Sequence, residues 1–141
     1  MVLSVQYGCK DEALPSRPQV RRWVRASCER PAEVAVRFVD AEEGRALNRD
    51  FRRKDYPTNV LSFDYETTPR IVGDLVVCPP VALREAFEQG KSAEAHFAHL
   101  IVHGMLHLVG YDHETGTEDA ARMEAREREI LAGLGYADPY D

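Results

Sequence analysis

The sequence lacks any apolar run long enough to cross a membrane. Its apolar runs, such as Leu75 to Cys78 and Leu100 to Val102, fall far short of the roughly 20 residues that a spanning helix needs. The N-terminus has no basic start followed by an apolar stretch and a small-residue cleavage site, so no secretory signal is recognised. We therefore expect a cytoplasmic protein with no membrane association.

Cysteine is scarce, and so is excess positive charge. Cys9, Cys28 and Cys78 are widely spaced and form no Cys-x-x-Cys pair, which argues against a disulfide framework. The 18 basic residues are outnumbered by 24 acidic ones, and the net charge of -6 argues against a protein that coats nucleic acid without specificity. Local basic patches are still available, although each stretch taken alone also fits a solvated face. The two stretches are Arg17, Arg21, Arg22 and Arg25, and Arg49, Arg52, Arg53 and Lys54.

Internal repeats, low-complexity tracts and a linker are also absent, so we expect one domain over residues 1–141. Alternating and β-branched runs predict four strands, of which the last two form a hairpin; they are Val2–Tyr7, Val34–Phe38, Asn59–Tyr65 and Ile71–Cys78. Capping residues and apolar periodicity predict five helices: Pro18–Glu29, Asp40 to about Arg49, Pro79–Gly90, Ser92–Val109 and Thr117–Leu131. The second helix is expected to end before the basic segment. The fold class predicted is α+β, a small mixed sheet of about four strands covered by helices.

The histidines are confined to one short part of the chain, because all five lie between positions 96 and 113. On a helix, His103 and His107 are four residues apart and share a face, so both rings can reach a common ion. Gly110 stands where a left-handed residue could end the helix and reverse the chain. His113 could then return as a third ligand.

The histidine and glycine spacing is that of the extended zincin motif, in which three imidazoles bind zinc. Three neutral imidazoles leave a fourth tetrahedral position open, as in catalytic zinc sites. We therefore predict a zincin-like metal-site helix and a catalytic Zn²⁺ ion held by His103, His107 and His113. Gly104 replaces the glutamate that serves zincin peptidases as general base, which argues against peptidase activity.

Other residues near the motif have less certain roles. His99 lies four residues before His103 and could replace one of the three ligands or orient one of them. His96 is expected to be an exposed or capping histidine. Asp112 and Glu114 flank His113 and could orient an imidazole or hold a water molecule, although acidic turn residues are commonly just solvated.

The sequence resembles the YbeY family of bacterial endoribonucleases, also called rRNA maturation factors. The resemblance rests on the segment from His103 to His113, on Leu47-Asn48, on Phe51 to Phe63, on Gly73 to Cys78 and on the acidic final helix, Met123 to Leu131. It covers most of the chain after residue 40. Asp64 departs from the family, which usually has proline there, and this puts the strand edge at that position in question.

The resemblance implies a zinc-dependent endoribonuclease that cleaves single-stranded RNA, with roles in ribosomal RNA maturation and ribosome quality control. The implied partners are ribosomal RNA and the small ribosomal subunit. The resemblance also implies a catalytic role for Arg52, together with His103, His107 and His113. The chemistry agrees, since a guanidinium can bind the oxygens of a phosphodiester as negative charge gathers on them.

The residues leave two other functions open. One is a non-catalytic assembly factor in which zinc stabilises the fold and basic segments bind ribosomal RNA. The other is a metallopeptidase, against which Gly104 argues. For an endoribonuclease the general base is not identified, since either a metal-activated water or an RNA 2'-hydroxyl could attack.

Overall fold

The computed structural model describes residues 1–112 and 116–141. The strands are β1 (Val2–Tyr7), β2 (Ala32–Phe38), β3 (Val60–Glu66) and β4 (Ile71–Val77). The helices are α1 (Arg17–Ser27), α2 (Ala41–Arg52), α3 (Pro79–Glu88), α4 (Ala93–Val109) and α5 (Thr117–Leu134).

The four strands form one mixed sheet in the order β1-β2-β4-β3. β2 pairs in parallel with both β1 and β4, while β3 pairs antiparallel to β4 as the outer strand of a hairpin. The register of this hairpin shifts between Asp64 and Glu66. The irregular strand edge therefore lies where the sequence places aspartate instead of the family's proline.

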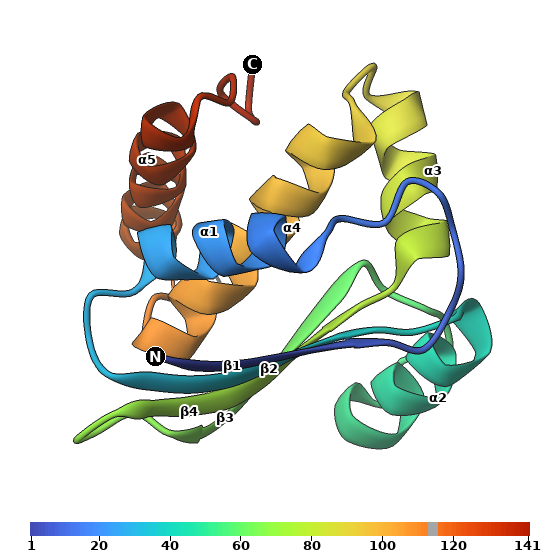
Figure 1. Cartoon of the computed structure of the whole chain (residues 1–141), viewed down its shortest axis with the longest axis horizontal. Helices are drawn as coiled ribbons and strands as arrows, with labels where there is room; N and C mark the ends of the chain where they lie inside the picture. Colours follow the sequence, from blue (N-terminus) through green and yellow to red (C-terminus); the bar gives the residue numbers. More distant parts are fainter. Residues whose placement is uncertain (113–115) are drawn as a thin grey trace.

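Helices α1, α3, α4 and α5 lie on one side of the sheet, and α2 lies on the other side near one end (Figure 1). α4 crosses the covered face and contacts β3, β4 and the other three helices on that side. Its apolar residues join the main core, whose largest fully buried side chains include Trp23, Phe38, Phe97, Leu75 and Ile101. The histidine-bearing helix is thus the central helix of the fold.

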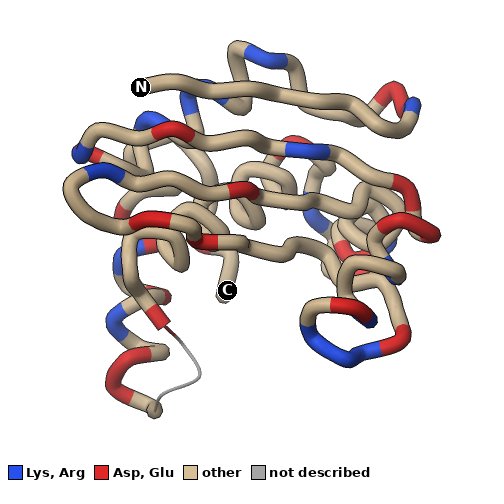
Figure 2. The backbone as a smooth tube through the Cα atoms, turned by 90° about the horizontal axis from the view of Figure 1, so that it is seen from below, with Lys and Arg blue, Asp and Glu red and all other residues tan. Residues whose placement is uncertain are grey.

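The opposite face of the sheet carries a smaller core under α2. Val39, Leu61 and Val76 are buried there, with Leu47 and Phe63 packed against them. Seen from this side, short acidic and basic segments are scattered along a chain of mostly uncharged residues (Figure 2). The segment Arg52–Lys54 is a run of three basic residues at the end of α2.

The predicted α+β class and the mixed four-stranded sheet are confirmed. The predicted end of α2 was wrong, because the helix continues to Arg52 and takes in part of the basic segment. The helix ends only at Arg53, which adopts a left-handed conformation (φ 59°) and donates its N–H to Arg49 O at 3.0 Å. Among the described residues, no helix is both long and apolar enough to cross a membrane.

Candidate active site

Four histidines form a row along one face of α4, called here the histidine row: His96, His99, His103 and His107. Neighbouring rings in the row have centroids 6.0, 6.3 and 4.8 Å apart. The helix begins at an N-cap, Ser92, whose side chain accepts from Ala95 N–H. The spacing of three and four residues places all four rings on the same side.

His103 and His107 approach each other through their Nε2 atoms, the ring nitrogens farther from the backbone. Their Nε2 atoms lie 3.2 Å apart, and both side chains are half-buried. Two nitrogens bound to one tetrahedral zinc ion, each at about 2.0–2.1 Å, would lie roughly 3.3 Å apart. The two nitrogens therefore lie about as far apart as two ligands of one zinc ion would.

α4 ends as the glycine predicts. Gly110 has φ 118° and donates its N–H to the carbonyls of Leu106 and His107, and Tyr111 N–H then donates to Leu106 O at 2.9 Å. These bonds satisfy carbonyls at the helix end and turn the chain away from the helix axis. The third predicted ligand, His113, and the neighbouring Glu114 lie outside the described residues. Asp112 is the last described residue before them.

His103 and His107 line a cleft of about 680 Å³ between α4, β3 and the end of α2. Arg52 lines the same cleft, so the structure brings three of the four predicted site residues to one cavity. Polar side chains also line the cleft, among them Asn59, Ser62, Asp64 and Asp112.

The loop after Arg52 is tied back onto α2. Arg45 and Asp55 form a bidentate ion pair, with N–O distances of 2.7 and 2.9 Å, and this pairing lowers the pKa of Asp55. Asn48, which is buried, donates from Nδ2 to Tyr56 O at 2.7 Å. These contacts hold the basic segment beside the cleft.

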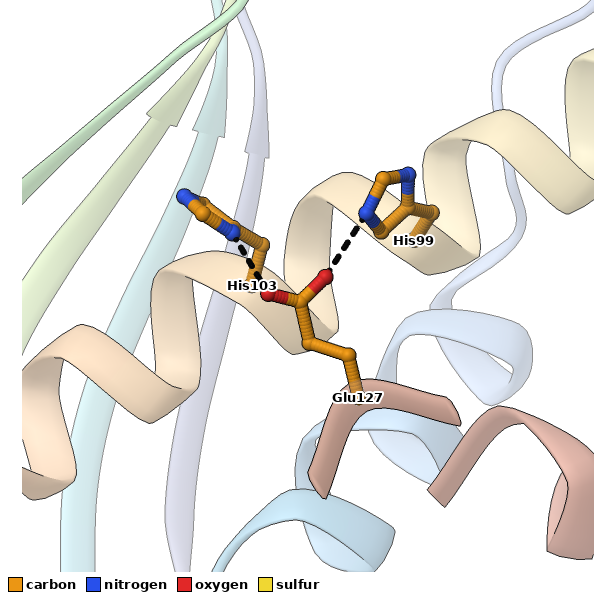
Figure 3. A group of neighbouring side chains, drawn as sticks. All are labelled: His99, His103 and Glu127. Atoms are coloured by element: carbon orange, nitrogen blue, oxygen red, sulfur yellow. Dashed lines mark hydrogen bonds and ion pairs between the residues drawn. The ribbon is translucent and has the colours of Figure 1, made fainter. Parts of the chain in front are cut away.

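Behind the histidine row lies a carboxylate that the sequence reading did not single out. Glu127 of α5 is fully buried, and its two oxygens lie 2.9 Å from His103 Nδ1 and 2.7 Å from His99 Nε2 (Figure 3). Tyr140 donates its hydroxyl to the same oxygen that contacts His99, at 2.7 Å. Burial raises the pKa of Glu127, but the hydrogen bonds from His103, His99 and Tyr140 outweigh it and bring the pKa to about 2.

This group could itself hold a metal ion. His99, His103 and Glu127 each offer a ligand atom, and these atoms lie within 4.8 Å of one another. The donor atoms differ from those facing the cleft, because here His103 would use Nδ1 and not Nε2. Neither His99 nor Glu127 lines the cleft.

Gly104, at the position of the zincin glutamate, faces the sheet. A Cβ atom there would lie 2.8 Å from Leu75 Cδ2 and 3.3 Å from Ser62 Oγ, closer than side chains pack. Ser62 also donates its hydroxyl to Gly104 O at 3.2 Å. A glutamate would therefore collide with the core, which explains the residue change and weighs against a zincin peptidase.

The comparisons with known proteins point to one family. A family model described as Endoribonuclease YbeY matches residues 13–135. The chain belongs to the YbeY endoribonuclease family. An Endoribonuclease YbeY of Methylibium petroleiphilum is 57% identical over 139 residues, covering 98% of this chain and 93% of the relative, and one of Polaromonas naphthalenivorans is 56% identical over 144 residues, covering 98% and 95%.

A solved structure supports the same fold. The solution structure of TM1509 from Thermotoga maritima matches with a TM-score of 0.59 and 25% identity, covering 99% of both chains. The resemblance noted from the sequence is thus confirmed at the level of the YbeY family, as is the enzyme class of that family.

Two further details of this YbeY-family chain differ from what the sequence suggested. His96 is neither exposed nor a cap, because only 3% of it is accessible and its Nε2 lies 3.0 Å from the Glu85 carboxylate. Glu127 was missed, although a signal exists: it shares a buried helix face with Met123, Ile130 and Leu131. A carboxylate among such residues needs a partner, and histidines were the available ones.

Proposed function

We propose that this protein is a zinc-dependent endoribonuclease that cleaves single-stranded RNA, with His103, His107 and His113 as zinc ligands and Arg52 as the residue that binds the scissile phosphate. The 3.2 Å approach of His103 Nε2 and His107 Nε2 at the wall of a cleft carries the proposal. Family membership supplies the reaction class, since the relatives are named endoribonucleases.

The end of α4 at Gly110 supports His113 as the third ligand. The hydrogen bonds of Gly110 and Tyr111 to the last turn end the helix, and His113 follows two residues after Tyr111 in the sequence. Three neutral imidazoles fit zinc, which accepts nitrogen ligands in a tetrahedral arrangement and keeps one position open in catalytic sites. A zinc ion bound there would supply Lewis-acid catalysis and a nucleophile at neutral pH.

The protein's own side chains would handle the substrate. Arg52 presents a planar guanidinium that can bind two phosphate oxygens and stabilise the charge that develops on them. Arg53 and Lys54 follow Arg52 in the chain, and their positive charge would attract the RNA backbone despite the acidic balance of the whole chain. An RNA substrate would have to place its phosphates in the cleft, within reach of both Arg52 and the two histidines.

The biological setting proposed is maturation of ribosomal RNA and ribosome quality control in the cytoplasm, with the small ribosomal subunit as partner. We propose that residues 1–141 act as a single catalytic domain in this role. The widely spaced free cysteines fit a reducing compartment.

The test is metal analysis joined to RNA cleavage, using wild type, His103→Ala, His107→Ala and His113→Ala. The expected result is about one zinc per chain in wild type, loss of zinc in the variants, and cleavage only by wild type. Analysis of product ends separates the two routes of attack, because a 2',3'-cyclic phosphate requires the RNA 2'-hydroxyl as nucleophile. Zinc-loaded wild type that binds RNA but does not cut it in a single turnover would support the non-catalytic assembly factor instead.

A further inference from the structure

An imidazole has two nitrogens, and a neutral ring can bind a metal ion only through the one without a proton. His103 faces the cleft with Nε2 and the protein interior with Nδ1, so its value as a ligand depends on which nitrogen carries the proton. We propose that Glu127 is a positioning residue that keeps the His103 proton on Nδ1, so that the lone pair on Nε2 can bind the metal ion. This inference rests on the proposed function for the identity of the ligand set.

The first support is the geometry of the contact. Glu127 Oε1 lies 2.9 Å from His103 Nδ1, and the two residues are 24 positions apart, on α5 and α4 (Figure 3). A carboxylate that is ionised can only accept hydrogen bonds. The nitrogen that faces it must therefore carry a proton, and in a neutral ring this leaves the lone pair on Nε2.

The second support is that the other oxygen of Glu127 is already used. Oε2 accepts from the Tyr140 hydroxyl and from His99 Nε2, each at 2.7 Å. Tyr140 also packs edge-on against the His99 ring, with centroids 5.4 Å apart. The carboxylate thus has no freedom to turn away from His103, which fixes the direction of the ring.

The same contacts argue against a metal ion held by His99, His103 and Glu127 themselves. An ion there needs the lone pairs of His99 Nε2 and His103 Nδ1, yet both nitrogens lie at hydrogen-bonding distance from an acceptor. Two ligands of one tetrahedral zinc ion lie roughly 3.3 Å apart. The contacts of 2.7 and 2.9 Å are shorter than this and fit hydrogen bonds. With protons on both nitrogens, each contact with the carboxylate is a hydrogen bond, so we infer that the carboxylate orients the ligand beside it.

A matched pair on the same helix provides the control. Glu85 of α3 contacts His96 Nε2 at 3.0 Å, so both carboxylates hold a histidine of the row, but only Glu127 holds a proposed ligand. Replacing Glu127 by glutamine should weaken zinc binding about 10- to 100-fold, as removal of such a partner typically does. Glu85→Gln should leave zinc affinity unchanged. Competition with a chromophoric chelator, on variants shown to be folded by circular dichroism, measures both.

The tautomer itself can be read without zinc or activity. Long-range ¹H–¹⁵N correlation spectra of metal-free wild type should show the His103 proton on Nδ1, and Glu127→Gln should lose this preference. A proton on Nε2 in wild type, or equal zinc affinity in wild type and Glu127→Gln, would overturn the inference. If wild type binds no zinc, the proposed function fails, while the wild-type spectrum still decides the role of Glu127 even if the variant does not fold.

Discussion

Asn59 donates a hydrogen bond from Nδ2 to the Glu85 carboxylate, 3.0 Å away, and so joins the wall of the cleft to the buried end of the histidine row. The same oxygen of Glu85 lies 3.0 Å from His96 Nε2. Burial raises the pKa of Glu85, but these two hydrogen bonds outweigh it and hold the pKa below its ordinary value.

The lowered pKa of Glu85 predicts a pH-dependent contribution to stability. A carboxylate with a lowered pKa in the folded protein stabilises it above the pKa of the unfolded chain, and the contribution is lost as pH falls through the folded value. We expect Glu85→Gln to lower the free energy of unfolding at pH 7 by about 1–3 kcal/mol. The difference from wild type should shrink from about pH 5 downwards, as Glu85 becomes protonated.

Urea unfolding at several pH values measures this difference. Glu129→Gln, on the exposed face of α5, is the control; it removes only a solvent-exposed ion pair with Arg126 and should stay within about 1 kcal/mol of wild type at every pH. A difference between wild type and Glu85→Gln that stayed constant from pH 7 to about pH 3 would show that the charge of Glu85 plays no part.

The close packing around Gly104 predicts that a glutamate at this position, as in the zincin motif, would destabilise the protein. Gly104→Glu would press a charged side chain against Leu75, and we expect a loss of more than about 3 kcal/mol of unfolding free energy. Gly133→Glu is the matched control, since no atom lies within 4 Å of a Cβ there, and it should change stability by less than about 1 kcal/mol. Thermal unfolding measures the stability of both variants. A Gly104→Glu protein as stable as wild type would contradict the packing argument. If that protein also digested casein, and only without chelator, the argument against a peptidase would fail as well.

Tyr136 links the end of α5 to the core. Trp23, which is fully buried, donates its indole N–H to the Tyr136 hydroxyl at 3.1 Å, and that hydroxyl donates to Glu94 at 2.6 Å. Tyr136→Phe leaves the indole donor without this acceptor and should lower the free energy of unfolding by about 1–3 kcal/mol. Denaturant unfolding measures the loss, and a variant as stable as wild type would mean that the indole donor had found another acceptor.

Removing the Arg52 side chain should impair catalysis without loss of the metal ion. Arg52→Ala should lower kcat for RNA cleavage by about 10²- to 10³-fold, the usual effect of removing one donor to a developing oxyanion. Zinc content should remain that of wild type, because the ligands are untouched. Arg84→Ala removes the same charge from the exposed surface of α3 and should cleave RNA as wild type does. Equal rates for both arginine variants would remove Arg52 from the mechanism.

Local signals in the sequence were enough to locate the central helix. Ser92 and Gly110 mark its two ends, and the three- and four-residue spacing places His99, His103 and His107 on one face. The hairpin of β3 and β4 was equally local, because a short polar reversal joins two β-branched runs. Such features depend on a few neighbouring residues, so sequence alone predicts them.

Features that depend on distant contacts were not predicted. The parallel pairing of β4 with β2 joins strands that are far apart in the sequence, and no local pattern specifies it. The end of α2 was misjudged because Arg53 closes the helix in a left-handed conformation that favours glycine. Glu127 meets His103 across 24 positions of sequence, so its role becomes visible only when α5 packs on α4.

Two donor sets share His103, and comparing His107→Ala with His99→Ala decides between them. The account predicts that wild type binds about one zinc per chain and cleaves RNA, that His107→Ala loses both properties, and that His99→Ala keeps its zinc. Metal analysis by mass spectrometry after dialysis, with cleavage of a single-stranded RNA on the same samples, is the direct measurement. Zinc retained by His107→Ala and lost by His99→Ala would contradict the account and place the ion between His99, His103 and Glu127.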